Sequence, residues 1–148
     1  MTKEDIFNEM EYKQGTGISD KFTILNFDIY KGYQYYILNL GTHPCSYILL
    51  DKDDKLYGKS ISELDDTGIY CHGGFSYASN VLHSKTYSYV NEFGDKWVIG
   101  WDYAHYRDWT GLYSDEINLR SNNKKWTTVE LVREVRDVID DLCEYNKE

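Results

Sequence analysis

The stretch that decides the fold is Phe22-Thr23-Ile24-Leu25-Asn26-Phe27-Asp28-Ile29-Tyr30-Lys31-Gly32-Tyr33-Gln34-Tyr35-Tyr36-Ile37-Leu38-Asn39-Leu40. Its two halves, residues 22–29 and 33–40, are rich in the β-branched and aromatic residues that favour strands. Between them, Tyr30-Lys31-Gly32 is typical of a tight hairpin turn. We therefore predict an antiparallel hairpin here, from which a sheet extends along the rest of the chain.

Further strands are predicted downstream of this hairpin. Residues 45–50 and 86–90 have the composition of strands, and apolar residues at 69–72 and 75–78 flank a pair of glycines. The segment from Lys96 to Trp101 is apolar on both faces. This pattern is typical of a strand that is central in its sheet or covered on both sides.

A long helix is predicted near the end of the chain. Thr127-Thr128-Val129-Glu130 is a capping-box pattern, and it opens a helix with apolar residues at core spacing that runs to about Asn146. A single helical turn is predicted at residues 60–64. A short amphipathic helix is predicted from Thr2 to about Tyr12.

These elements indicate one domain of the α+β class. We predict that it spans residues 21–148 and contains an antiparallel sheet of about five to seven strands, with the C-terminal helix packed on one face. Residues 1–20 are predicted to be an appendage, formed by the short N-terminal helix and a loop. A chain of 148 residues is long enough for one domain with a hydrophobic core, but it is short for two domains that each need a core of their own.

The chain is acidic and rich in aromatic residues. Its 16 Lys and Arg against 25 Asp and Glu give a net charge of −9. The acidic residues are spread along the chain, which keeps a protein soluble and disfavours direct nucleic-acid binding, because phosphates are repelled. The 15 Tyr, 4 Trp and 5 Phe make up 16% of the residues, and such side chains suit both a core and the wall of a ligand site.

The cysteines and the first residues bear on the cellular compartment. Cys45, Cys71 and Cys143 are widely separated and odd in number, which argues against a disulfide framework or a zinc ribbon and favours a reducing cytosol. The polar stretch Met1-Thr2-Lys3-Glu4-Asp5 predicts no signal peptide, and no apolar run approaches the ~20 residues that span a bilayer. We expect a cytoplasmic protein without a membrane partner.

Cys71-His72-Gly73-Gly74 is the first of two stretches that an ordinary strand or helix does not require. Paired glycines permit positive φ angles and allow backbone N–H groups to approach an anion. His72 adds a charge that switches near neutral pH. For the glycines, the plainer explanation of a two-residue hairpin turn is favoured on sequence alone.

The second stretch is Trp97-Val98-Ile99-Gly100-Trp101-Asp102-Tyr103-Ala104-His105-Tyr106-Arg107-Asp108. If its second half forms a helical turn, Asp102 is placed to orient His105 as a general base, or both bind a divalent metal with His72 and Asp108. A purely structural role is favoured over metal binding: Asp102 caps the turn by accepting its N–H groups, and His105 serves only as a hydrogen-bond partner of Asp102. No two histidines share a recognised ligand spacing, so neither a metal nor another cofactor is expected.

Further candidates accompany these two stretches, which we expect to meet at one solvent-accessible hollow. Arg107 is either an ion-pair partner of the nearby acids or an anion clamp. The four tryptophans are expected to be mostly core, but Trp109 lies outside any periodic run and is the best candidate for a stacking wall on a planar ligand. The candidate catalytic pair is Asp102 and His105. The candidate ligand-binding residues are His72, Gly73, Gly74, Tyr77, Trp101, Asp102, His105, Arg107, Asp108 and Trp109.

A resemblance to a protein family is carried by Tyr57-Gly58-Lys59, by Ile69-Tyr70-Cys71-His72-Gly73-Gly74-Phe75-Ser76-Tyr77, and by Trp97 to His105 with Asp108. These motifs resemble a family of small uncharacterised proteins of bacteriophages and prophages. The family pattern is a Tyr-Gly-Lys step, then His-Gly-Gly-(Leu or Ile)-Thr-Tyr, then Trp-(Ile or Phe)-Gly-Phe-Asp-x-Ala-His-x-x-Asp and a closing helix. The likeness covers roughly residues 44–142, and Phe75, Ser76 and Trp101 depart from the pattern.

The resemblance implies a context and not a reaction: a dispensable phage gene that acts on host metabolism or host defence, in the cytoplasm of a bacterial host cell. No catalytic residue follows from it.

We expect a phage- or prophage-encoded accessory protein that counters host defence by binding a small anionic, nucleotide-like ligand, with binding favoured over catalysis. The first alternative is a hydrolase that uses Asp102 and His105, with or without a divalent metal. The second is an acidic inhibitor of a host nuclease such as a CRISPR effector. The partner is then a small molecule or a host defence protein, and a homo-oligomer stays open.

Overall fold

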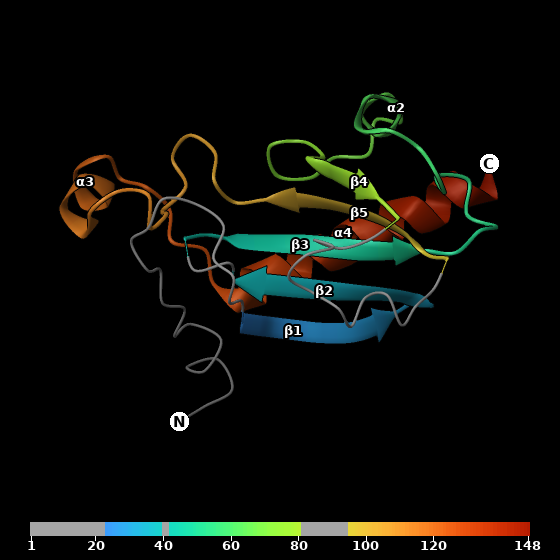
Figure 1. The fold of residues 1–148 in the computed structure, drawn as a ribbon, viewed down its shortest axis with the longest axis horizontal. Helices are drawn as coiled ribbons and strands as arrows, with labels where there is room; N and C mark the ends of the chain where they lie inside the picture. Colours follow the sequence, from blue (N-terminus) through green and yellow to red (C-terminus); the bar gives the residue numbers. More distant parts are fainter. Residues whose placement is uncertain (1–22, 40–41, 81–94) are drawn as a thin grey trace.

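The computed structural model describes residues 23–39, 42–80 and 95–148, and it has the α+β fold that the sequence predicts (Figure 1). Five strands form one antiparallel sheet in the order β1-β2-β3-β5-β4. The strands are β1 (Thr23–Tyr30), β2 (Tyr33–Asn39), β3 (Pro44–Leu50), β4 (Tyr77–Ser79) and β5 (Trp97–Asp102). The predicted N-terminal helix and the predicted strand at 86–90 lie outside the described residues.

The helices of the described residues are α2 (Ile61–Asp65), α3 (Asp115–Arg120) and α4 (Thr128–Lys147). The long helix α4 crosses one face of the sheet (Figure 1). Helix α2 confirms the helical turn predicted at residues 60–64, whereas α3 is an addition to the predicted elements. No helix in the described part of the chain combines the length and apolar composition that a membrane span needs.

The hairpin of β1 and β2 forms as predicted. Lys31 and Gly32 connect the two strands with φ angles of 49° and 85°. Two successive positive φ angles are the mark of a type I′ turn, whose twist matches that of the flanking strands. Tyr30 pairs with Tyr33 directly beside this turn, which sets the register of the hairpin.

Strand β5 is interior to the sheet, as its two apolar faces predicted, because it pairs with both β3 and β4. Ile99 and Trp101 belong to the core beneath α4, whereas Val98 belongs to a second buried cluster on the opposite face. At Gly100 the neighbouring strand is so close that a Cβ would lie 2.6 Å from the Ser46 carbonyl oxygen. The strand that leads into the candidate site is therefore held on both faces.

Helix α4 begins at the predicted capping box. The Thr127 side chain accepts the N–H of Glu130, and the Glu130 carboxylate accepts the N–H of Thr127. A cap of this kind contributes about 1 kcal/mol to helix stability. The helix buries an apolar stripe that comprises Leu131, Val135, Val138, Ile139 and Leu142. Because the helix start is fixed, Trp126 just before it is also held in place.

Candidate functional site

The first of the two turns that build the site carries His72. The Gly74 N–H donates to the Cys71 carbonyl oxygen at 3.0 Å, and Gly73 and Gly74 have φ angles of 71° and 84°. Residues 69–71 are not a strand, so this is a β-turn that precedes β4 and not the two-residue hairpin loop favoured from sequence. Both glycines nevertheless meet the expected requirement for positive φ angles.

The second turn follows β5 directly. The Asp108 N–H donates to the His105 carbonyl oxygen at 2.9 Å, and Arg107 has a φ angle of 73°. The segment is therefore a tight turn, and the helical turn that would stack Asp102, His105 and Asp108 does not form. A left-handed φ angle is uncommon for arginine, and such angles are concentrated at functional sites.

His72 and Asp108 meet where these two turns lie side by side. His72 Nε2 is 2.7 Å from Asp108 Oδ2. The Asp108 side chain is 3% exposed. It accepts two further hydrogen bonds, from the His105 N–H to Oδ2 at 2.9 Å and from Trp126 Nε1 to Oδ1 at 2.9 Å. These donors compensate the carboxylate for the water that burial removes.

His72 and Asp108 each stabilise the charged form of the other. The hydrogen bond to Asp108 raises the pKa of His72, against the opposing effect of burial. Burial acts to raise the pKa of Asp108, but hydrogen bonds from His72, the His105 backbone and Trp126 outweigh it and hold this pKa below its usual value. The arrangement thus favours an imidazolium paired with a carboxylate.

Aromatic rings fix the orientation of the His72 imidazole. It stacks on Tyr103, with ring centroids 4.9 Å apart and 6° between the planes. Trp126 approaches it with a centroid distance of 5.0 Å, and His105 crosses it at 86° and 5.5 Å. The His72 ring is therefore confined to one plane, with its Nε2 directed at Asp108.

The predicted pair of Asp102 and His105 is looser than the pair of His72 and Asp108. His105 Nδ1 lies 3.5 Å from Asp102 Oδ1, which is too long for a hydrogen bond. Asp102 Oδ1 instead accepts the Ala104 N–H at 3.1 Å. His105 Nδ1 is buried and has no hydrogen-bond partner among the described residues.

His43 is a neighbour that the sequence analysis missed. Burial lowers the pKa of His43, while the charges of Asp102 and Asp108 act to raise it, so His43 lies within electrostatic range of the site. Its Nδ1 is 2.8 Å from Thr42 Oγ1. No motif marks this histidine, because it precedes β3 and reaches the site through the pairing of β3 with β5.

A cavity of about 480 Å³ opens beside the second turn. Its lining residues are Ala104, His105, Tyr106, Arg107, Asp108, Thr110, Leu112, Tyr113, Ile117, Ser121 and Asn123. Among these described residues, Arg107 is the one Lys or Arg and Asp108 the one carboxylate. Small-molecule sites typically measure roughly 300–1,000 Å³, so the cavity has the size of a ligand site.

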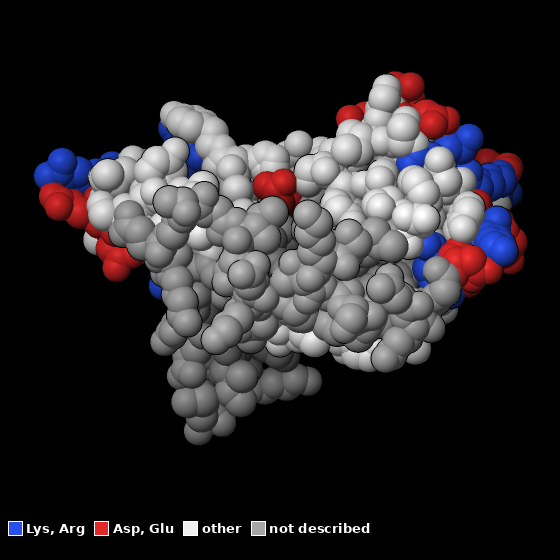
Figure 2. Space-filling view, viewed as in Figure 1, with Lys and Arg blue, Asp and Glu red and all other residues white. Residues whose placement is uncertain are grey.

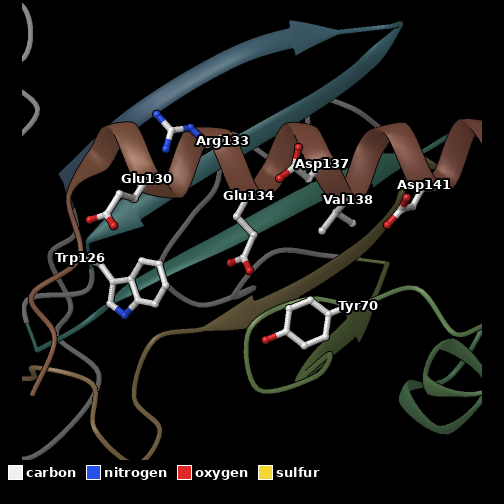
Figure 3. Close-up of a pocket in the computed structure, with 8 residues that line it drawn as sticks. All are labelled: Tyr70, Trp126, Glu130, Arg133, Glu134, Asp137, Val138 and Asp141. Atoms are coloured by element: carbon white, nitrogen blue, oxygen red, sulfur yellow. The ribbon is translucent and has the colours of Figure 1, made fainter.

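A second hollow, of about 280 Å³, runs beside α4 (Figure 3). Its lining residues are Tyr70, Trp126, Glu130, Arg133, Glu134, Asp137, Val138 and Asp141. Figure 3 shows Glu134 directed from α4 into the space between Trp126 and Tyr70. We call this hollow the acidic groove, because its lining residues include four carboxylates and one arginine. An anionic ligand is repelled there.

The remaining predicted residues are not brought to the cavity. Trp101 is 1% exposed and lies in the core, where its Nε1 donates to Glu134 at 3.0 Å. Tyr77 contacts Tyr47 on the opposite face of the sheet. Trp109 is half-buried, with Lys125 Nζ 5.3 Å from its ring centroid.

Trp126 contacts the pair of His72 and Asp108, whereas Trp109 was the tryptophan predicted to form a stacking wall on a planar ligand. Its indole bonds to Asp108 and its ring contacts both His72 and Tyr103. The signal that distinguished Trp109, a position outside any periodic run, also applies to Trp126, which directly precedes the cap of α4. Tyr103 and Glu134 were also missed, and their hydrogen bond joins the loop after β5 to α4.

The arrangement defines an α+β protein with a half-buried histidine paired to a buried aspartate beside an open cavity, and it allows three kinds of chemistry. A carboxylate that orients an imidazole is the geometry of a general base. Arg107 on the cavity wall is suited to an anion. His72, His105 and Asp108 each offer one ligand atom for a metal ion. Compared with protein-family models, curated proteins and solved structures, the chain matches none of them.

Proposed function

We propose that the chain is a phage- or prophage-encoded accessory protein that binds a small anionic, nucleotide-like ligand in the cavity beside Arg107 and so counters a host defence. The observation that carries this proposal is the charge of the cavity wall. Arg107 stands there without an ion-pair partner among the described residues, and the one carboxylate, Asp108, is already paired with His72.

The cavity wall therefore presents an arginine without an ion-pair partner among the described residues, on a chain of net charge −9. Charge-assisted hydrogen bonds from an arginine to phosphate are among the strongest available to a protein. Tyr106 and Tyr113 line the same cavity and provide aromatic faces for a base. The phage context comes from the resemblance of the His72 and Trp97–Asp108 motifs to the phage family.

Calorimetry tests the proposal directly. The protein is titrated with AMP, ATP, cyclic mononucleotides, cyclic dinucleotides and neutral adenosine, in the presence of EDTA. We expect binding of at least one phosphorylated compound and none of adenosine. Uniform absence of heat, with tryptophan fluorescence also unchanged, removes the proposal.

Arg107→Gly is the informative variant, because glycine tolerates the left-handed φ angle at this position. We expect it to weaken nucleotide binding by at least about 10-fold, the value of one hydrogen bond to a charged group. Arg120→Gln is the matched control, since Arg120 pairs with Glu116 on α3 and does not line the cavity. Equal affinities of the two variants contradict the proposed site.

A hydrolase is the second candidate, and the 2.7 Å contact of His72 with Asp108 favours it. In its neutral form, an imidazole that is oriented in this way through Nε2 can accept a proton from water at Nδ1. A hydrolase predicts product release from a phosphorylated substrate, lost in His72→Gln. Asp102→Ala tests the base pair predicted from sequence in the same assay.

An acidic inhibitor of a host nuclease is supported less by the charge distribution. On the face drawn in Figure 2, the described Asp and Glu side chains gather mainly at the two ends of the molecule, intermixed with Lys and Arg. A protein that mimics DNA needs a continuous run of acidic side chains with few Lys or Arg side chains between them. Salt-sensitive binding to a basic nuclease, unaffected by Arg107→Gly, is the outcome that would favour this function over ligand binding.

A further inference from the structure

Three potential metal ligands converge where the two turns meet. His72, His105 and Asp108 each offer one ligand atom, and these atoms all lie within 4.8 Å of one another. In a four-coordinate zinc site with bonds of about 2.0–2.2 Å, neighbouring ligand atoms are roughly 3.3 Å apart. Small side-chain rotations therefore bring the three atoms around one ion. From this convergence we infer that His72, His105 and Asp108 bind a divalent transition metal ion.

The His105 ring packs with its face over the turn that carries His72. A Cβ placed on Gly73, the residue next to His72, would lie 2.4 Å from both Cδ2 and Nε2 of His105 and 2.5 Å from its Cε1, and these nearly equal distances place it over the ring. Nδ1 lies on the side of Asp102, 3.5 Å from its Oδ1. We therefore assign metal binding to the other ring nitrogen, Nε2.

The unpartnered Nδ1 of His105 is the independent observation that points to a metal. Buried ring nitrogens without a hydrogen bond are rare, yet this one is buried and has no partner in the described part of the chain. In metal sites, a ligating histidine donates its second N–H to a carboxylate or carbonyl. A metal at Nε2 places the proton on Nδ1, and Asp102 accepts it after closing by less than about 1 Å. Asp102 is then a positioning residue.

The ligand types select the metal. Two imidazoles and one carboxylate favour Zn²⁺ and similar transition metals over Mg²⁺ and Ca²⁺, which prefer oxygen. Three protein ligands leave a coordination position for water or a ligand, as in catalytic zinc sites. His105 and Asp108 also line the cavity beside Arg107, so the ion borders that cavity. Metal binding replaces the contact between His72 and Asp108 with two metal–ligand bonds.

The inference goes beyond the proposed function and does not rest on it, because zinc is tested alone and nucleotides are tested in EDTA. Tag-free full-length protein, stripped with EDTA and dialysed, is titrated with ZnCl₂ and with MgCl₂ by calorimetry. We expect a single saturable zinc site and no saturable magnesium binding. Replacement of Zn²⁺ by Co²⁺ is expected to give the visible absorption of a site of low coordination number with nitrogen ligands. Absence of saturable zinc binding overturns the inference.

Variants assign the site to its residues. His105→Gln is the primary variant, because this side chain is 32% exposed and its loss leaves the buried carboxylate in place. We expect its zinc affinity to fall by more than about 100-fold, and that of Asp102→Ala, which removes the acceptor for His105 Nδ1, by about 10- to 100-fold, as for outer-shell partners. Asp115→Asn, an exposed acid on α3, is the control and should bind as the wild type does. Circular dichroism checks that each variant is folded. Wild-type affinity or an unchanged cobalt spectrum in folded His105→Gln overturns the metal site, and wild-type affinity in folded Asp102→Ala overturns the positioning role.

Discussion

Trp126 holds Asp108 from the side opposite to His72. The indole Nε1 donates to Asp108 Oδ1 at 2.9 Å, while Oδ2 of the same carboxylate contacts His72 Nε2 at 2.7 Å. The two donors come from segments before α4 and before β4, which are distant in the sequence. The buried carboxylate thus links three parts of the chain, and its orientation depends on all of them.

Trp126→Phe tests the contribution of this indole N–H. Phenylalanine keeps an aromatic ring beside His72 but leaves a buried carboxylate oxygen without its donor. We expect the free energy of unfolding to fall by about 1–3 kcal/mol, measured by urea denaturation at neutral pH. Trp109→Phe is the matched control, and its loss should be smaller because that indole makes no such bond to a carboxylate of the described residues. Equal losses in the two variants would show that the bond contributes nothing specific.

Gly73→Ala and Gly74→Ala separate backbone strain from steric contact at the first turn. Both glycines have positive φ angles, so each substitution carries a conformational cost of about 1–2 kcal/mol. A Cβ at Gly73 would lie 2.4 Å from the His105 ring, whereas at Gly74 the nearest atom, Asp65 Oδ1, is 3.7 Å away.

We therefore expect Gly73→Ala to reduce the free energy of unfolding by about 1–3 kcal/mol more than Gly74→Ala, because the alanine methyl displaces the His105 ring. Urea denaturation of the two variants measures the difference. Similar losses in both would mean that the imidazole moves aside at no cost and that close packing at Gly73 is unimportant.

The elements that could be predicted from the sequence are those that local signals determine. The type I′ turn at Lys31-Gly32 and the capping box at Thr127 depend on residues within a few positions of each other, and both were correctly placed. Helix α3 carried the same kind of signal, since Ser114 caps it by accepting the Ile117 N–H. Helix α3 is therefore also determined by a local signal, although it was not among the predicted elements.

The pairing inside the site could not be predicted in the same way. The three-residue steps from Asp102 to Asp108 suit a helical turn, but the left-handed φ angle of Arg107 turns the chain so that Asp108 faces His72. That choice depends on tertiary contacts, because Trp126 and the His105 backbone hold the Asp108 carboxylate. The sequence therefore indicated that His72 and Asp108 take part in one site, but its spacing predicted the wrong geometry for the turn that ends at Asp108.

The capping box of α4 provides a pH-dependent stability test away from the site. Burial acts to raise the pKa of Glu130, but hydrogen bonds from Lys124 and Thr127 outweigh it and hold this pKa below its ordinary value of 4.5. A carboxyl group with a lowered folded-state pKa stabilises the fold above its unfolded-state pKa. This contribution is lost as the pH falls below about 4.5 and through the folded-state value.

Glu130→Gln removes the charge and retains an oxygen that accepts the Thr127 N–H. We expect the variant to be less stable than the wild type by about 0.5–1 kcal/mol at pH 7, and the difference to shrink as the pH falls below 4.5. Urea denaturation between pH 3 and pH 7 measures it. A difference that is constant across this range would show that the effect of Glu130 does not come from its charge.

The three cysteines are expected to differ in reactivity according to burial. Burial raises the pKa of Cys45 to about 12 and also raises the pKa of Cys71, while Cys143 is half-buried. Because the thiolate is the reactive form, Cys143 should react with an aromatic disulfide reagent in a fast phase and the other two slowly.

The slow phase also reports on the strand that leads into the site. Cys45 pairs with Asp102 between β3 and β5, so its thiol becomes accessible when these strands separate. Its reaction rate should therefore rise in parallel with local unfolding as urea is added. Cys143→Ser should remove the fast phase and leave the slow one unchanged. A fast phase that persists in this variant would mean that Cys45 or Cys71 is more accessible than its burial indicates.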